Sequence, residues 1–340
     1  MQNSIGFYSQ AVKVLDEFPQ SKAPPIQIVK YLNHNGVCLE ELVWAGILDK
    51  NHNLSNQFNE FKLINKNVWV PLLNAQLMNI CETQINNDVF FNRFLYGNYS
   101  NYRIIFLNYP FNGCHEYNNF YSLHFPQIKN TLVFIVLTDR ILDGKKCLHV
   151  EGIQSEWSQF GKQHGFIKNQ LMVEDTLNKI NEINKEKNEK NIIEINNLTY
   201  KYISKIKTAV PDGPFVQDPT RWIDLAIGRI LIEAVKNDYD AIIFTMGNKQ
   251  RKRFASDKKL KFFYDLWISK RLNLILHKYD FSNKIENRIY CNENEENIAY
   301  IKLSDATKIK VLNGVPNYYT NLSYYYRSHK EKFTKFSNDV

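Results

Sequence analysis

The strongest constraint on the fold is a long amphipathic helix that leads directly into an apolar strand. Asp218 and Pro219 are residues that favour the cap and the first turn of a helix. Apolar residues then recur at helical spacing over residues 223–235, and Asn237-Asp238 ends the helix before the apolar segment Tyr239–Thr245. A helix with one apolar face must bury it, so the pattern predicts packing against a sheet or another helix.

Three apolar segments upstream of this helix predict strands. They are Tyr102–Leu107, Thr131–Thr138 and Cys147–Ile153. Asp143-Gly144 lies between the second and third segments, and Asp-Gly flanked by apolar runs is a strong signal for a β-hairpin. Downstream, the pattern predicts a helix over 262–279, a strand over 298–303 and a short helix over 304–312.

These elements predict an α+β protein. We expect a helical N-terminal subdomain over residues 1–92, followed by an α+β domain over 100–320 that is built as a mixed sheet with packed helices. The charged segment 171–206 is typical of a helical insertion at the surface or of a partly disordered insertion. Residues 327–340 form a basic, polar tail.

The composition excludes several classes of protein. Hydrophobic residues make up 44% of the 340 residues, which is enough for a packed core. The five cysteines are widely spaced, so we expect reduced thiols and neither a disulfide framework nor a cysteine-rich zinc site. No signal peptide is evident, and the longest apolar run, near 132–137, is far shorter than the roughly 20 residues of a membrane span. We therefore expect a soluble protein of intracellular type with no membrane partner.

Several short blocks resemble a module of the large polyvalent proteins of tailed bacteriophages and mobile elements. The most distinctive, Glu151–Gln159, is similar to the family's E-E-I-Q-S-D-W-H-Q, and Val210–Phe215 resembles its V-P-D-A-P-F. Other blocks follow in the family's order across residues 24–316: Asn101-Tyr102-Arg103, His124-Phe125, Trp222 with Arg229, Tyr239-Asp240, Gln250 with Arg253, and Phe263-Tyr264-Asp265. The resemblance implies a phage-derived protein, located in the host cytoplasm or in the virion.

The chain departs from the family's pattern at polar positions. Gly152 stands where the family has a second acidic residue, Glu156 replaces its Asp, and Ser158 replaces its His. Asn248 replaces the Glu that follows Gly247. Either this divergent copy has lost part of a chemical site, or the family's role is structural.

The first candidate site follows the third predicted strand. Glu151, Gln154, Glu156 and Trp157 lie where that strand enters a loop, and strand ends often carry functional side chains. Two carboxylates in different environments could act as a general acid and a general base. The alternative is that Trp157 packs in the core while the polar groups cap the backbone.

The second candidate site follows the apolar strand that ends at Thr245. Gln250 and Arg253 lie at helical spacing just beyond it. A guanidinium group there could bind a carboxylate or a phosphate. A salt bridge from Arg253 to Asp240 or Asp265 is the alternative.

The net charge of +8 is compatible with an anionic partner. The densest basic segment runs from Lys249 to Arg253, and Lys249 is a candidate to bind an anion. Basic and aromatic residues continue beyond it, at Phe254, Lys258, Lys259, Lys261, Phe262 and Phe263. Cations with interleaved aromatic rings bind single-stranded nucleic acid, although a solvated helix face is the commoner explanation.

No histidine pair has the spacing of metal ligands, and the sequence contains no Walker A, G-x-G-x-x-G or G-x-S-x-G motif. We therefore predict no metal site and no P-loop, dinucleotide-binding or serine-hydrolase chemistry. No cofactor is evident, and a nucleotide cofactor stays open.

Two functions remain. The first is an accessory or virion-associated protein that binds DNA or phage structural proteins, as the phage resemblance and the positive charge indicate. The second is an enzyme, a small-group transferase of the acyl type, with Glu151, Glu156 and Arg253 in one pocket. Its support is an order of strand, loop, long helix, strand, helix and strand in the second half, which resembles acyl-CoA N-acyltransferases at the level of the fold. The glycine turn expected there before the long helix is not evident in Val210–Phe215.

Overall fold

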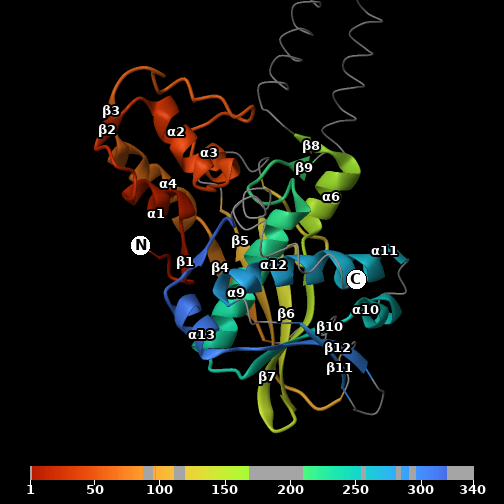
Figure 1. The fold of residues 1–340 in the computed structure, drawn as a ribbon. Helices are drawn as coiled ribbons and strands as arrows, with labels where there is room; N and C mark the ends of the chain where they lie inside the picture. The colour runs from red at the N-terminus through yellow and green to blue at the C-terminus, as the bar shows by residue number, and fades with distance from the viewer. Residues whose placement is uncertain are drawn as a thin grey trace, which may run out of the picture.

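A seven-stranded mixed sheet forms the centre of the computed structural model (Figure 1). The structure describes residues 2–86, 95, 97–110, 119–167, 210–253, 258–280, 285–290 and 296–319. The insertion expected over 171–206 and the tail expected over 327–340 lie outside these residues.

The sheet combines an antiparallel meander with one parallel pair. β4, β5, β6 and β7 pair in sequence order, β10 lies parallel to β7, and β12 and β11 complete the other edge in antiparallel fashion. The seven strands are β4 (Cys81–Ile85), β5 (Ser100–Asn108), β6 (Thr131–Leu142), β7 (Lys145–Gln154), β10 (Ala241–Thr245), β11 (Glu286–Tyr290) and β12 (Glu296–Lys302). This arrangement confirms a mixed sheet with packed helices.

The hairpin predicted at Asp143-Gly144 is confirmed. β6 and β7 pair from Leu142 and Lys145 onward, so the turn has two residues. Asp143 and Gly144 have φ values of 53° and 73°. Two-residue turns with positive φ at both positions match the twist of the strands that they join, which is why Asp-Gly is favoured there.

The long helix predicted after Asp218 is α9 (Pro219–Lys236), and the Asp218 side chain accepts a hydrogen bond from the Thr220 amide (2.9 Å). α9, α12 and α13 cover one face of the sheet (Figure 1) and enclose the main apolar core. The other elements of this half are α10 (Gly247–Arg253), α11 (Lys258–Phe262), a π-helix labelled η3 (Phe263–Ile268), α12 (Ser269–Tyr279) and α13 (Asp305–Leu312).

The N-terminal helices form a subdomain with a core of its own. That core includes Leu15, Leu32, Leu42 and Trp69, all of them buried. The elements of the subdomain are α1 (Gln10–Asp16), β2 (Lys22–Ala23), α2 (Pro25–His34), α3 (Leu39–Trp44), β3 (Ile64–Asn65), a 3-10 turn (Lys66–Trp69) and α4 (Val70–Met78). β4, although it lies inside the range 1–92, belongs to the central sheet.

Two short parallel pairs join distant parts of the chain. β1 (Phe7–Tyr8) pairs with β13 (Val315–Pro316), and β8 (Phe166–Ile167) pairs with β9 (Val210–Pro211). α6 (Glu156–His164) follows β7 directly. Within the described part of the chain, no helix is long and apolar enough to cross a membrane.

Candidate functional site

The pairing between β7 and β10 ends at the point where β7 carries an extra residue. Val136 of β6 faces Gly152, but the next residue of β6, Leu137, faces Val150, so Glu151 forms a bulge. The parallel pairing of β7 with β10 ends at Val150 and Phe244. The carboxyl ends of two neighbouring parallel strands therefore separate here, which is a common place for ligands in open sheets.

The Glu151 carboxylate lies at the centre of a buried polar cluster. It is 2% exposed and accepts a hydrogen bond from each of two arginines, Arg140 (2.7 Å) and Arg253 (2.6 Å). The hydroxyls of Thr138 (2.9 Å) and Thr245 (3.5 Å) also donate to the carboxylate, and His149 Nδ1 lies 3.1 Å from Oε1 without forming a hydrogen bond. The sequence-predicted residues Glu151, Thr245 and Arg253 are thus in contact.

The protonation states in this cluster follow from its burial and its neighbouring charges. Burial raises the pKa of Glu151, but His149, Arg253 and Arg140 together hold it well below its usual range, so the carboxylate is ionised. Burial lowers the pKa of His149 more than the nearby Glu151 raises it, so the imidazole is neutral. Two guanidinium groups therefore face one carboxylate in a site screened from water.

Side chains from α10 and η3 occupy the gap where the strands part. Gln250 and Arg253 both donate to the main-chain oxygen of Glu151, Arg253 at 3.0 Å. The Tyr264 hydroxyl bonds to both the N–H (3.1 Å) and the C=O (3.0 Å) of Ile153. A Cβ at Gly152 would lie 3.3 Å from that hydroxyl, so a larger side chain at this position would press on Tyr264.

Two buried polar atoms in this gap have no hydrogen-bond partner among the described residues. They are Gln250 Oε1, an acceptor, and Arg253 Nε, a donor. Buried polar groups are nearly always satisfied in native proteins, so such a pair at the end of parallel strands marks a candidate binding site.

Glu156 belongs to a different cluster. It is the first residue of α6, and its carboxylate accepts hydrogen bonds from the Ser122 hydroxyl, the Leu123 amide (2.9 Å) and His124 Nδ1. Glu156 is 5% exposed, whereas the His124 side chain is 41% exposed. A buried carboxylate that orients a partly exposed imidazole is an arrangement suited to general acid–base chemistry.

The remaining candidate residues predicted from the sequence do not contact the carboxylates of Glu151 and Glu156. Trp157 packs in the core: it stacks on Phe120 with ring centroids 5.5 Å apart, and its Nε1 donates to the Pro211 oxygen (2.7 Å). Gln154 ends the pairing of β7 with β6, opposite Phe134. Lys249 is half-buried on α10, next to Gln250.

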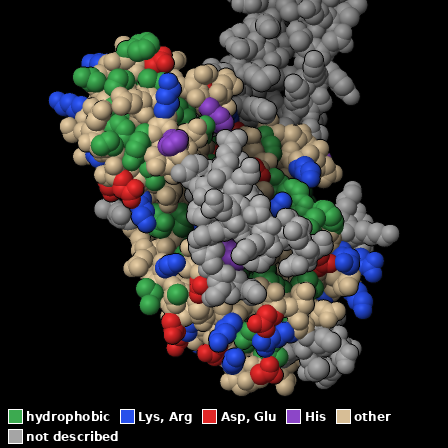
Figure 2. All heavy atoms as spheres, in the orientation of Figure 1, with side chains coloured by type: hydrophobic (Ala, Val, Ile, Leu, Met, Phe, Trp, Pro, Cys, Tyr) green, Lys and Arg blue, Asp and Glu red, His purple; other side chains and the backbone are tan. Residues whose placement is uncertain are grey.

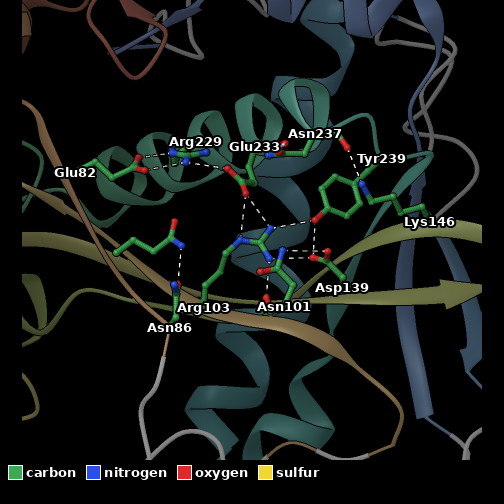
Figure 3. Close-up of polar contacts among 11 residues, drawn as sticks. Glu82, Asn86, Asn101, Arg103, Asp139, Lys146, Arg229, Glu233, Asn237 and Tyr239 are labelled. Carbon is green, nitrogen blue, oxygen red and sulfur yellow. Dashed lines mark hydrogen bonds and ion pairs between the residues drawn. The ribbon is translucent and has the colours of Figure 1, made fainter.

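A third polar cluster brings together residues from segments that are far apart in the sequence (Figure 3). Arg103 on β5 bonds to Asp139 on β6 (2.9 Å), to Glu233 on α9 (2.9 Å) and to the Tyr239 hydroxyl (3.2 Å). Arg229 also pairs with Glu233, at 2.9 Å. These contacts fasten α9 to the sheet, which gives Arg103, Arg229 and Tyr239 a structural role.

Arg140, His149, Tyr264 and His124 were not singled out as site residues by the sequence. A signal for two of them exists, because Thr138 and Arg140 on β6, like His149 and Glu151 on β7, are spaced by two and so share one face of the hairpin. In the part of the chain that the structure describes, no three His, Cys, Asp or Glu side chains are grouped to hold a metal ion. Comparisons with protein-family models, curated proteins and solved structures found no match to this chain.

Proposed function

We propose that the chain is a small-group transferase of the acyl type whose site lies where β7 and β10 part. The observation that carries this proposal is the bonding of Ile153, whose N–H and C=O both bond to the hydroxyl of Tyr264. The Tyr264 side chain thus makes the two main-chain hydrogen bonds that a neighbouring strand makes elsewhere in the sheet. An extended ligand with amide groups, such as the carrier arm of an acyl-CoA, could take these bonds over if Tyr264 turned away.

The polar groups around Gly152 suit such a ligand. Gln250 Oε1 offers an acceptor and Arg253 Nε a donor, both buried. The Arg253 guanidinium beside this gap favours an oxygen that gains negative charge, as the carbonyl oxygen of an acyl group does during transfer. The order β7, α9, β10, α12 and β12 adds support, because it follows the order that resembles acyl-CoA N-acyltransferases.

Glu151 is not the base in this proposal. Its carboxylate is buried, ionised and fully bonded, so it has no capacity to accept a proton from a substrate. Its role is to hold Arg253 in position. His124, oriented by Glu156 where β7 passes into α6, is the group we assign to accept a proton from the acceptor amine or hydroxyl as the acceptor bonds to the acyl carbon. The thioester C–S bond then breaks, and His124 returns the proton to the leaving thiolate. We place this activity in the host cytoplasm or the virion, as the phage resemblance implies.

Binding of acetyl-CoA tests the proposal. We expect acetyl-CoA, unlike NAD, ATP or S-adenosylmethionine, to raise the thermal midpoint, since a ligand at 100 times its Kd adds about 2.7 kcal/mol of stability. Gln250→Ala should weaken binding by about two- to tenfold, because a hydrogen bond contributes roughly 0.5–1.5 kcal/mol. Gln163→Ala, at an exposed position of α6, is the matched control and should leave binding unchanged.

Tyr264→Phe distinguishes a ligand site from general damage. It removes the hydroxyl that competes with the ligand for Ile153, so acetyl-CoA should bind several-fold more tightly, although the free protein becomes less stable. If acetyl-CoA produces no shift, or if Tyr264→Phe weakens binding as Gln250→Ala does, the transferase proposal is wrong.

A further inference from the structure

The outer side of α10 and the adjoining π-helix form a surface that is both basic and aromatic. On α10, Arg251 and Lys252 are exposed, and on the next helices Lys270, Phe262 and Trp267 are exposed as well. We call this set the α10–η3 surface. None of it takes part in the contacts of the candidate transferase site.

Within the described residues, the positive charges of this surface have no carboxylate partner. Arg251, Lys252 and Lys270 make no ion pair in the described part of the chain, whereas the neighbouring Lys261 is paired with Asp265 (2.6 Å). Figure 2 shows Lys and Arg side chains gathered at the right-hand edge of the molecule, where Figure 1 places α10. Unpaired cations on one helix face produce a local field that attracts a polyanion.

Three apolar side chains are exposed on the segment that packs against α10. Phe262 is 56% exposed, Leu266 is 49% exposed and Trp267 is 38% exposed. Their spacing of four and five residues places them on one side of a π-helix, which has more residues per turn than an α-helix. α10 packs directly on this segment, because the Gly247 amide donates to the Asp265 carboxylate at 2.7 Å. Exposed aromatic rings next to cations are the combination that binds unstacked bases and phosphates together.

We propose that the α10–η3 surface binds single-stranded nucleic acid. Arg251, Lys252 and Lys270 contact phosphates, while Phe262 and Trp267 stack on bases. Duplex DNA fits less well, because its bases are already stacked and their faces are not available to the rings. The proposal is independent of the transferase site, since that site uses the inward-facing Gln250 and Arg253 of the same helix.

Fluorescence anisotropy with a labelled oligo-dT tests the proposal on the full chain. Trp267→Ala should weaken binding by about tenfold, as stacking of one base contributes roughly 1–3 kcal/mol. Trp267→Phe, which keeps a ring, should retain most of the affinity. The double variant Arg251→Gln/Lys252→Gln should reduce the slope of log K against log salt by about 1.4, because each phosphate contact on a single strand contributes roughly 0.7.

A double variant with the same change in net charge provides the control. Lys22 and Lys30 are exposed on the N-terminal subdomain, and Lys22→Gln/Lys30→Gln should leave both the affinity and the salt slope nearly unchanged. If this control weakens binding as much as the α10 variant, the attraction is a property of the net charge and the proposal is overturned. Unchanged affinity of Trp267→Ala, or binding to vesicles of phosphatidylserine and phosphatidylcholine with none to oligo-dT, would overturn it as well.

Discussion

Glu41 should make the protein less stable as the pH rises from 5 to 8. Its carboxyl group is fully buried beneath the first turn of α1, where it accepts hydrogen bonds from the Ser9 hydroxyl (2.5 Å) and the Ala11 amide (3.2 Å). Burial raises the pKa of Glu41 to about 7, and these hydrogen bonds offset only part of the rise.

The sign and size of the effect follow from proton linkage. Between the ordinary pKa of 4.5 and the folded value of about 7, the folded protein holds a proton that the unfolded chain has released. The free energy of unfolding therefore falls as the pH rises through this window. At about 1.4 kcal/mol for each pKa unit, the loss is about 3 kcal/mol once the pH exceeds the folded value.

Urea unfolding of the wild type and of Glu41→Gln at several pH values from 5 to 8 measures this loss. The glutamine keeps an oxygen that can accept a hydrogen bond from the Ala11 amide, but it has no charge to bury. The difference in unfolding free energy between the two proteins should therefore change by about 3 kcal/mol across the range. His149, whose pKa burial lowers, affects both proteins alike and cancels. A difference that stays constant with pH would refute the reasoning.

Three further substitutions test the buried contacts. Arg103→Met leaves the half-buried Asp139 without its cation and the half-buried Glu233 with Arg229 alone, and urea unfolding should register a loss of about 3–5 kcal/mol. Glu151→Gln leaves Arg140 and Arg253 facing a neutral group, so we expect a loss in the same range, whereas Glu286→Gln at an exposed edge position should change stability little. Gly247→Ala places a Cβ 2.4 Å from the Lys261 oxygen and should lower the thermal midpoint, with a cost of about 1–3 kcal/mol. Gly144→Asn is the control for that change, since its Cβ meets nothing within 4 Å and Asn tolerates positive φ; an equal loss in both glycine variants would contradict the steric explanation.

Elements whose ends are marked by local sequence signals could be predicted from the sequence alone. Asp218 and Pro219 define the start of α9, and Asp143-Gly144 defines the turn between β6 and β7, because in each case the side chain or the φ preference acts within a few residues. The α+β class followed from the alternation of such elements.

Contacts between distant segments could not be predicted in the same way. Nothing local to β7 or β10 specifies that they pair in parallel, or that the pairing stops at Val150 and Phe244. The contact between Glu151 and Arg253 depends on that stop. Glu156 was grouped with Glu151 because the two are close in sequence, but the helix that begins after Ser155 directs Glu156 to His124.

The parallel pair of β1 and β13 has a consequence for how the fold is completed. Phe7 faces Val315, so residues about 300 positions apart must meet before the pair exists, and contacts of such long range form slowly in folding. Two amides report on this event: Val315 donates to the Gly6 oxygen (3.1 Å) and Asn317 to the Tyr8 oxygen (3.0 Å). In native-state hydrogen exchange, we expect these amides to become accessible together when β1 and β13 separate, while the local hairpin of β6 and β7 stays protected.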